Sequence, residues 1–176
     1  MDSFFIARSS TSSFRSPFET APSPNNMDND AVLQRSLHNK VLTLCFNDPR
    51  RKNAWGASLL SSVLSSLTEA ASDPNVAVVV LTGRGDYYCS GVDFVSSFPI
   101  KPPSALAAHL EVANQKLFDT FLDFPKPLIV AANGPSIGAA VTTASLCDAV
   151  LAHPTATFHT PFAVLRYYSW ISPNPK

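Results

Sequence analysis

Two glycine-containing turns, each placed after an apolar strand segment, constrain the fold of this chain more than any other feature. The first turn spans residues 88–93 (YCSGVD) and follows the apolar run 76–81. The second turn spans residues 133–140 (NGPSIGAA) and follows the run 128–132. About 45 residues separate the turns, which is enough for one helical crossover between parallel strands. The pattern predicts that each strand leads into a tight turn and a helix, with the two turns side by side.

Two adjacent turns of this kind can direct two free backbone N–H groups toward one point. Such paired donors are typical of an oxyanion hole, which stabilises the negative charge that develops on a carbonyl oxygen. Gly91 or Gly138 alone is an ordinary turn or packing residue, and Asn133-Gly134-Pro135 alone is an ordinary turn. Their joint context indicates carbonyl or thioester chemistry.

The rest of the ordered pattern alternates strands with helices. Continuous or alternating apolar runs predict strands, and apolar residues at spacings of three and four predict amphipathic helices. In chain order, the predicted elements are a strand at 41–46, a helix at 57–71, a strand at 76–82, a helix at 104–122, a strand at 128–132, a helix at 137–146 and a strand at 149–152. This alternation predicts an α/β fold built from right-handed βαβ units.

Composition narrows the function classes. The chain has 176 residues, of which 45% are hydrophobic, and this is enough for one well-buried domain. Its formal net charge is zero, so nothing points to a nucleic acid or an anionic membrane as a partner. No apolar run reaches the ~18–20 residues that span a bilayer. The three cysteines are widely spaced and odd in number, which argues against a disulfide framework and a zinc site and fits a reducing compartment or an organelle matrix.

The first 30 residues differ in composition from the rest and predict a disordered N-terminal tail. Their Ser- and Arg-containing start is compatible with a mitochondrial transit peptide. Asp2, Glu19 and the small number of basic residues favour an untargeted tail, so both interpretations stay open. Pro17, Pro22 and Pro24 predict a stiff, non-helical linker into the domain.

Six short segments, in a fixed order between about residues 38 and 165, carry a family resemblance. They are DPRRKNAW (48–55), VVLTG (79–83), YCSGVDF (88–94), PKPLIVAANGP (125–135), LCDAV (146–150) and ATFHTPF (156–162). In these segments the chain resembles the crotonase superfamily of enoyl-CoA hydratases and isomerases. The Asn-Gly-Pro turn and the FHTPF segment look most like the Δ3,Δ2-enoyl-CoA isomerase branch and its chromodomain-Y relatives.

The resemblance implies a fold and a domain organisation. The fold is crotonase-like (ClpP/crotonase), with a core of repeated ββα units arranged as a spiral and without the family's C-terminal helical part. A partial crotonase-like domain would cover residues 31–165, between the tail at 1–30 and a divergent C-terminal tail at 166–176. The family forms trimers, and self-association of this chain stays open. The implied location is the peroxisomal or mitochondrial matrix, with the cytoplasm as the alternative.

The resemblance also assigns roles to the two turns. In the family the first oxyanion-hole donor is the backbone N–H of the residue after the turn glycine, which is Val92 here. The second is the N–H of Ala139, in the small-residue run of the second turn. Main-chain amides make this site, so the side chains of both residues are immaterial to it.

Four further residues would belong to the region that binds the coenzyme A part of the substrate. The resemblance places Lys52 near a phosphate and Ala54 near the adenine, with Ser90 and Asp93 close by. The implied partner is an acyl-CoA or enoyl-CoA thioester, which itself carries the coenzyme A, so no separate cofactor is expected. Asp93 is also a candidate to cap the helix that follows the first turn.

The chain departs from the family where the catalytic carboxylates are expected. Thr142 occupies the position of one hydratase glutamate and Phe162 that of the second. The isomerase glutamate lies a few residues further on, where this chain reads LRYYSW at 165–170. A hydrolase triad is not expected either, because Ser90 does not lie in a Gly-x-Ser-x-Gly elbow, and His159 is better explained as a structural histidine.

Two functions from different classes follow from these matches and departures. The first is an enoyl-CoA isomerase-like protein of fatty-acid β-oxidation that shifts a 3-enoyl-CoA double bond to trans-2-enoyl-CoA, weak or inactive because the glutamate is absent. The alternative is a non-catalytic acyl-CoA-binding or protein-interaction relic. Loss of a proton-transferring group typically removes ~10²–10⁴-fold of the rate, so turnover discriminates the two.

Overall fold

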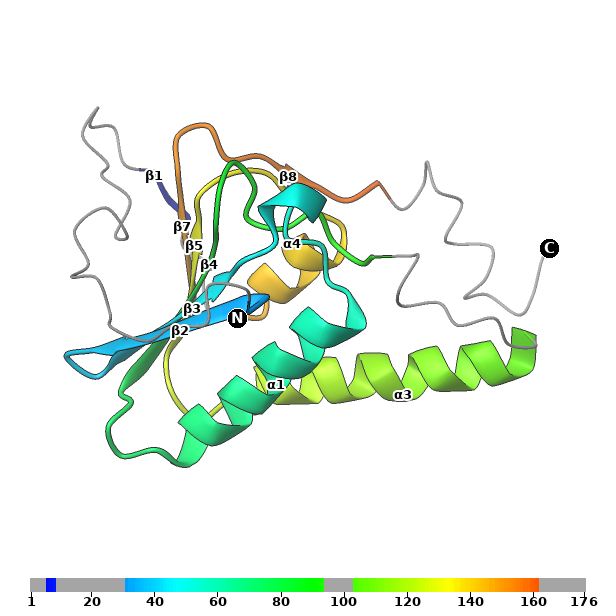
Figure 1. Ribbon diagram of the computed structural model, residues 1–176, viewed down its shortest axis with the longest axis horizontal. Coiled ribbons are helices and arrows are strands. Elements are labelled where there is room, and N and C mark those ends of the chain that lie inside the picture. The colour runs from blue at the N-terminus through cyan, green and yellow to red at the C-terminus, as the bar shows by residue number, and fades with distance from the viewer. Residues whose placement is uncertain (1–5, 9–30, 94–102, 162–176) are drawn as a thin grey trace.

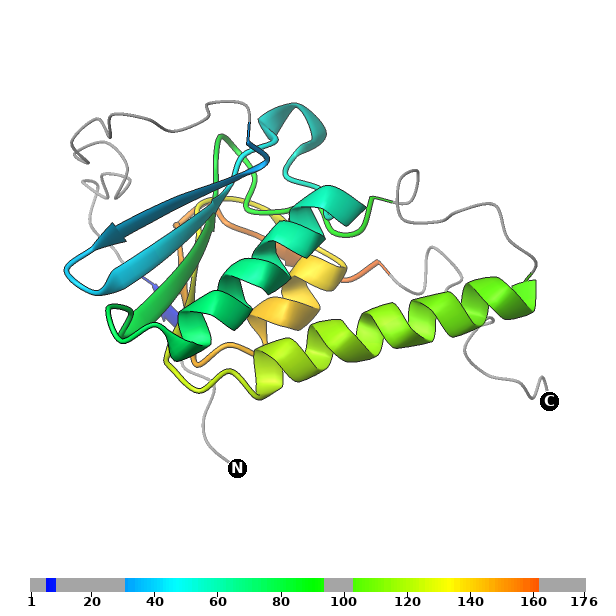
Figure 2. The same cartoon turned by 60° about the horizontal axis from the view of Figure 1, so that its bottom comes forward.

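A six-stranded sheet packs against helices on one of its sides in the computed structural model, which describes residues 6–8, 31–93 and 103–161 (Figures 1 and 2). The strand order is β1-β7-β5-β4-β3-β2. The strands are β1 (Ile6–Arg8), β2 (Leu33–His38), β3 (Val41–Phe46), β4 (Val78–Gly83), β5 (Leu128–Ala132) and β7 (Ala149–Ala152), and a small second sheet contains β6 (Ser136–Ile137) and β8 (Phe158–His159). The helices are the short 3-10 helix η1 (Pro49–Arg51), α1 (Ala57–Ser72), α3 (Pro103–Leu122) and α4 (Ala139–Ala144).

The central strands follow one another in space in the same order as in the sequence. β3 pairs with β4, β4 with β5 and β5 with β7, all in parallel, whereas β2 is antiparallel to β3. Each crossover therefore steps in the same direction across the sheet, and crossovers of one hand place their helices on one face. Figures 1 and 2 show α1, α3 and α4 on that face. The carboxyl ends of the parallel strands lie along one edge, so the loops after them meet there.

Most of the predicted elements are confirmed. The strands at 41–46, 128–132 and 149–152 have the expected bounds, and α1 and α3 each differ by one residue from the prediction. The third helix is shorter than expected, because Ser136 and Ile137 pair with β8 in a parallel register. α4 begins only after Gly138, whose φ of 58° lies outside the helical region.

The expected N-terminal tail contains a strand, which differs from the prediction of disorder for residues 1–30. β1 pairs in parallel with β7, with Ile6 opposite Val150 and Arg8 opposite Ala152. Without it, the N–H and C=O groups along that side of β7 would lack ladder partners, and this is the physical reason for an added strand there. The rest of the tail and the divergent segment at 166–176 lie outside the described residues.

The core lies between the sheet and its helices. In β3, β4 and β5 the side chains that form the core include five that are fully buried: Leu44, Val79, Leu81, Leu128 and Val130. From α1, Leu59, Val63 and Leu67 pack on the same core at helical spacing. Three aromatic residues continue this core toward the loops at the carboxyl edge, with ring centroids 6.1 Å apart for Phe46 and Trp55 and 5.3 Å apart for Phe46 and Tyr88.

Candidate functional site

The two glycine-containing turns lie side by side at the carboxyl edge of the sheet. The Cys89 N–H donates to the Pro135 carbonyl at 3.4 Å, and the Ile137 N–H donates to the Cys89 carbonyl at 3.0 Å. A Cβ atom added to Gly91 would lie 2.6 Å from the Ile137 carbonyl oxygen and 3.6 Å from the Ala139 nitrogen. The first turn is therefore pressed against the second, and no side chain fits between them.

Both turns need glycine for their backbone conformation as well as for space. Gly91 has a φ of 88° and Gly138 a φ of 58°, in the left-handed region that L side chains rarely adopt. A Cβ atom added to Gly138 would meet no heavy atom within 4 Å, so the requirement for glycine at this position is conformational alone.

The amides of Val92 and Ala139 are the two donors that the family resemblance assigns to the oxyanion hole. In the described part of the chain, neither of these N–H groups donates a hydrogen bond to the protein. Trp55 is bonded to both neighbours of Val92, donating to the Gly91 carbonyl at 2.7 Å and accepting from the Asp93 N–H at 3.1 Å. In such a parallel bridge the Val92 N–H points away from Trp55.

Ala139 has a free amide for a different reason. It is the first residue of α4, and the first N–H groups of a helix have no intrahelical acceptor. The preceding Gly138 N–H is used by the His159 carbonyl at 2.8 Å, and the following Val141 N–H returns to the Gly138 carbonyl at 3.0 Å. The Ala139 amide, which the family resemblance assigned as the second donor, is thus one of the unused amides at the start of α4.

Lys52 and Ala54 lie on the segment that borders the first turn. The Lys52 carbonyl accepts from the Ser90 N–H at 3.0 Å, so this segment is tied directly to the turn. The Lys52 Nζ atom lies 4.9 Å from the centre of the Tyr87 ring, an exposed cation–π contact. Ala54 is half-buried, with its N–H bonded to the Arg51 carbonyl at 3.1 Å.

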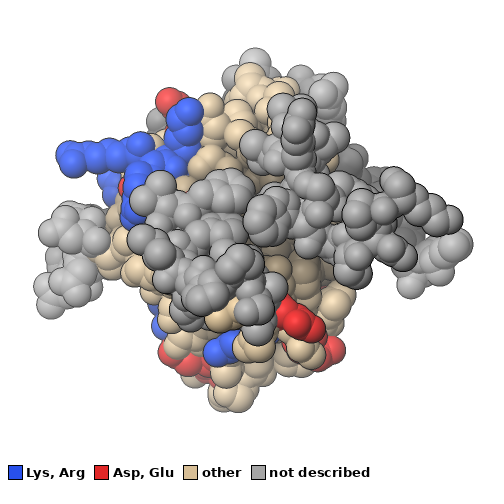
Figure 3. Space-filling model, turned by 90° about the vertical axis from the view of Figure 1, so that its right-hand side faces the viewer, with Lys and Arg blue, Asp and Glu red and all other residues tan. Residues whose placement is uncertain are grey.

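This edge of the molecule carries several exposed basic side chains. They come from η1, from its C-cap and from the loop after β4, and they are Arg50, Arg51, Lys52 and Arg84. Figure 3 shows Lys and Arg side chains gathered at the upper left of the face that it presents. Such a group can attract the phosphates of a nucleotide.

Asp93 is held in an ion pair. The Arg51 guanidinium lies 3.0 Å from the Asp93 carboxylate and 2.7 Å from that of Asp48, and it joins the two. The hydrogen bond and the charge of Asp48 raise the pKa of Arg51, so this cation stays protonated. The helix that Asp93 was expected to cap would begin at residues 94–102, which lie outside the described residues. Arg51 partly neutralises Asp93, which otherwise would repel an anionic ligand.

The side chains of the first turn serve structure and are not nucleophiles. The Ser90 hydroxyl lies 3.4 Å from the Arg51 carbonyl, which accepts its hydrogen bond. The Cys89 sulfur accepts a hydrogen bond from the Gly91 N–H at 3.3 Å, and burial raises the pKa of this thiol to about 12. A thiol protonated at neutral pH is a poor nucleophile.

Two of the residues considered for the acid–base positions, Thr142 and His159, lie in the described part of the chain. Thr142 is half-buried on α4, and its hydroxyl lies 3.5 Å from the Gly138 carbonyl. His159 is exposed on β8 and contributes its backbone carbonyl to the second turn. Phe162 and the segment 165–170 lie outside the described residues.

Two residues of the site appeared in the sequence only as parts of motifs. Asn53 and Asn133 each use their side-chain amides to bind the loop after β4. The signal for Asn133 was its place directly after a buried strand, and for Asn53 its place between charged residues and a tryptophan. Neither signal shows whether the asparagine only forms a local turn or binds a distant segment through its side chain.

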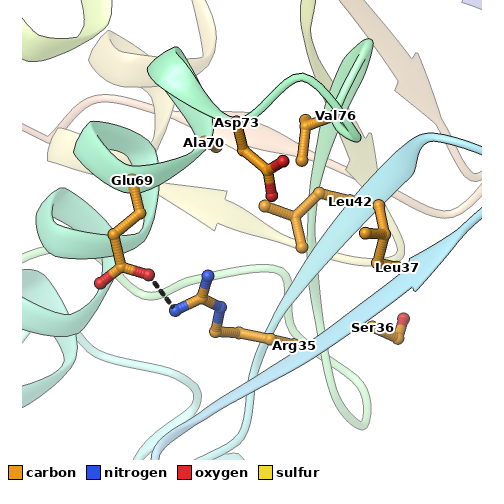
Figure 4. A pocket seen from close by; sticks show the side chains of 8 residues that line it. All are labelled: Arg35, Ser36, Leu37, Leu42, Glu69, Ala70, Asp73 and Val76. Atoms are coloured by element: carbon orange, nitrogen blue, oxygen red, sulfur yellow. Dashed lines mark hydrogen bonds and ion pairs between the residues drawn. The ribbon is translucent and has the colours of Figure 1, made fainter.

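A cavity of about 220 Å³ lies elsewhere, between β2 and the C-terminal end of α1. Figure 4 shows the Arg35 side chain extending from β2 to Glu69 on α1, where the ion pair measures 2.7 Å. The other lining residues are Ser36, Leu37, Leu42, Ala70, Asp73 and Val76. Leu42 and Val76 precede or begin parallel strands, so this cavity is at the opposite edge of the sheet from the two turns.

Metal-ligand clusters and helices that could span a membrane are both absent from the described residues. No cluster of three or more potential metal ligands lies among them. None of the helices in these parts of the chain has the length and apolar character needed to cross a membrane.

Comparison with known proteins extends these observations. Residues 36–169 match the family model described as enoyl-CoA hydratase/isomerase. Human enoyl-CoA delta isomerase 2 is 41% identical over 128 residues, covering 71% of this chain and 32% of its own length. Mouse peroxisomal enoyl-CoA delta isomerase 3 is 38% identical, covering 71% of this chain and 39% of its own length. The chain thus spans about a third of the length of these curated relatives.

Two further relatives bear on the branch and the fold. Human testis-specific chromodomain protein Y 1 is 32% identical over 113 residues, covering 63% of this chain and 21% of its own length. A putative enoyl-CoA hydratase/isomerase structure from Acinetobacter baumannii superposes with a TM-score of 0.66 at 33% identity, covering 77% of this chain and 56% of that one. These matches confirm the expected crotonase-like α/β fold and the resemblance to the isomerase and chromodomain-Y branch.

Proposed function

The chain belongs to the enoyl-CoA hydratase/isomerase family, and on that premise we propose that it binds an acyl-CoA or enoyl-CoA thioester with the carbonyl oxygen between the Val92 and Ala139 amides. The observation that carries the proposal is the pair of unused N–H groups on two turns that touch at Gly91. Fixed main-chain donors stabilise an enolate-like oxygen without reorganising when its charge develops. Val92 is 36% exposed, so this part of the first turn lies at the surface of the molecule.

The basic edge beside the first turn supports binding of the coenzyme A part. Lys52 projects from the segment that is hydrogen-bonded to Ser90, so a phosphate bound there would lie close to the turn. Ala54 would lie near the adenine, and Ser90 and Asp93 would complete the substrate region. Arg51 is paired with Asp48 and Asp93, and the exposed side chains of Arg50, Lys52 and Arg84 supply the positive charge that would favour an anionic nucleotide.

The reaction we propose is the isomerase one, at a low rate. Removing a C2 proton from a 3-enoyl thioester gives a dienolate, and returning a proton to C4 gives the 2-enoyl product. This shift needs a base within hydrogen-bond reach of the substrate. Thr142 has no ionisable group to provide it, and the Asp93 carboxylate is engaged by Arg51. We therefore expect this polypeptide to bind and polarise the thioester, with turnover ~10²–10⁴-fold below that of an isomerase with its carboxylate.

A second function is favoured by the chromodomain-Y likeness and the same departures from the catalytic pattern. The chain would then be a non-catalytic acyl-CoA-binding or protein-interaction module. Purified protein should be tested for turnover of trans-3-enoyl-CoA beside its affinity for acyl-CoA. Measurable isomerisation supports the enzyme, and binding without turnover supports the module.

Replacing Ala139 by proline tests the paired amides. Proline removes one N–H and is otherwise tolerated at the first position of a helix. We expect Ala139→Pro to weaken acyl-CoA binding by ~10-fold or more and to abolish any isomerisation, because one donor to the carbonyl oxygen is lost. Calorimetric titration with an acyl-CoA and the turnover assay give the two measurements.

Ala139→Ser is the matched control, since it changes the same first residue of α4 and keeps its main-chain N–H. The control should bind like the wild-type protein. Equal affinity of Ala139→Pro and wild type for the acyl-CoA would contradict the proposed site.

The proposed location is the peroxisomal or mitochondrial matrix. A peroxisomal isomerase among the relatives supports the first of these compartments. Imaging of the protein tagged at either end in separate experiments would test it, and an even cytoplasmic distribution of both versions would contradict it.

A further inference from the structure

Two side-chain amides hold the loop between β4 and the first turn, at residues 84–88. We propose that Asn53 and Asn133 act together as positioning residues that set the separation of the Val92 and Ala139 amides. The inference rests on the proposed function, because it concerns the same two donors. It assigns a role to side chains at a site whose ligand contacts come from the backbone.

Asn53 is fully buried and uses both ends of its side chain. Its Oδ1 atom accepts from the Asp48 N–H at 2.9 Å, and its Nδ2 donates to the Arg84 carbonyl at 3.0 Å and to the Tyr87 carbonyl at 2.8 Å. Its φ of 54° is left-handed, a conformation that asparagine adopts more readily than most residues. Asn53 thus connects the start of η1 to the loop at Arg84 and Tyr87.

Asn133 makes the same kind of connection from the end of β5. Its Oδ1 atom accepts from the Gly83 N–H at 3.0 Å, and its Nδ2 donates to the Gly85 carbonyl at 2.7 Å and to the Tyr87 carbonyl at 3.3 Å. The Tyr87 carbonyl therefore receives a hydrogen bond from each asparagine. Both side chains meet at one peptide group, two residues before Cys89.

The loop is packed tightly against the backbone beside both asparagines. A Cβ atom added to Gly134 would collide with the Asp86 carbonyl oxygen, and one added to Gly83 would collide with the Tyr87 carbonyl oxygen. Only glycine fits at these two positions, and the two asparagine amides supply hydrogen bonds to the Arg84, Gly85 and Tyr87 carbonyl groups.

Each asparagine also lies in a segment that is bonded to a turn. The segment after Asn53 binds the first turn, with the Trp55 N–H donating to the Gly91 carbonyl at 2.7 Å. The segment after Asn133 becomes the second turn, where Ile137 is bonded to Cys89 at 3.0 Å. Loss of the bonds to Tyr87 would free the loop that joins these contacts. Misplacement of a donor by ~1 Å can cost ~10²-fold in an enzyme site.

The test separates carbonyl polarisation from binding. Asn53→Asp and Asn133→Asp keep the Oδ1 acceptor and the side-chain shape but remove both N–H donors. The readouts are the infrared stretching frequency of the bound thioester carbonyl, with butyryl-CoA labelled by carbon-13 at that carbon, and the Kd for coenzyme A alone. Thermal unfolding confirms that each variant is folded.

We expect each variant to bind coenzyme A with a Kd within ~3-fold of wild type, because the basic edge is intact. The carbonyl shift is the difference in stretching frequency between bound and free butyryl-CoA. Each variant should lose at least about half of this shift, because the donors are displaced. Lowering the pH should restore part of the shift, since protonation of the introduced carboxyl supplies one donor. Asn114→Asp, an exposed change of the same kind on α3, should leave both readouts unchanged.

The outcomes distinguish the two proposals. A wild-type protein that binds butyryl-CoA without a carbonyl shift would overturn the proposed function. A wild-type shift that persists in full in both folded variants would overturn the positioning role alone. If the aspartate variants do not fold, Asn133→Ser removes the same donors at the half-buried position, and a full shift in that variant would overturn the role.

Discussion

At the scale of single residues, this site depends on two glycines, Gly91 and Gly138, that have no Cβ atom. Gly91 brings the first turn within contact of the second, and Gly138 reverses the chain into α4 so that the Ala139 amide stays unused. The side chains around them have supporting roles, such as the Cys89 sulfur that binds the Gly91 N–H. Substitutions that change the backbone should therefore affect the site more than substitutions that change a functional group.

Gly91→Ala tests the contact between the turns. The new methyl group would lie 2.6 Å from the Ile137 carbonyl oxygen, so one turn must move. We expect a loss of acyl-CoA binding of ~10-fold or more, together with a destabilisation above the ~1–2 kcal/mol that a left-handed alanine costs by itself. Titration calorimetry and urea unfolding measure the two effects.

Gly85→Ala provides the comparison, because Gly85 has a similar φ of 80° and its added Cβ would meet only the Pro49 Cβ, at 3.1 Å. It should carry the conformational cost and retain the affinity. Equal affinities for the two variants would contradict a steric role of the first turn.

At the scale of elements, a single lysine joins the helix layer to the sheet. The Lys126 ammonium donates to the Ala70 and Asp73 carbonyls, both at 2.6 Å, where α1 ends. Lys126 precedes β5 and lies between two prolines, so the chain enters the strand with its backbone direction restricted. A cation at the C-terminal end of a helix also interacts favourably with the helix dipole.

Lys126→Met should lower the free energy of unfolding by ~1–3 kcal/mol, since two half-buried carbonyls lose a charged donor. Lys116→Met changes the same side chain at an exposed position of α3 and should stay within about 0.5 kcal/mol of wild type. Urea unfolding of both variants gives the comparison. Similar stabilities of the two variants would show that the lysine does not cap α1.

At the scale of the whole molecule, three free thiols are buried in different parts of one core. Burial raises the pKa of Cys45 from 9.0 to about 11 and the pKa values of Cys89 and Cys147 to about 12. They lie on β3, in the first turn and after α4. The folded protein therefore keeps these protons at pH values where an unfolded chain loses them.

The sign of the pH dependence follows from that difference. Below pH 9 both states hold the protons and the stabilisation is fully present; as the pH rises from 9 toward 12, the unfolded state binds fewer protons and the free energy of unfolding falls. Each thiol contributes a slope of up to about 1.4 kcal/mol per pH unit. Urea unfolding between pH 8 and about 10.5 should show the decline, and Cys147→Ala and Cys147→Ser should both flatten it. An unchanged slope in both variants would contradict this account.

The order of the elements and the positions of the two turns could be predicted from local patterns in the sequence. Apolar runs and helical spacing are local properties, so the strands at 41–46, 128–132 and 149–152 could be predicted to the residue. The short pairs β6 and β8 could not, because two residues carry no periodicity, and neither could the strand at Ile6–Arg8, whose partner is far away in the sequence. The ordered motifs were enough to indicate the family.

The contacts of the two turns and of the polar residues around them form only in the folded chain. These contacts join segments that lie 31 to 50 positions apart in the sequence. They are the approach of Gly91 to Ile137, the ion pair of Arg51 with Asp93, and the hydrogen bonds of Asn53 and Asn133 to the loop after β4. An asparagine in a turn and an asparagine that holds a distant loop look the same in a sequence. The difference lies in which carbonyl groups the fold brings within hydrogen-bond distance, and that depends on the packing of the whole sheet edge.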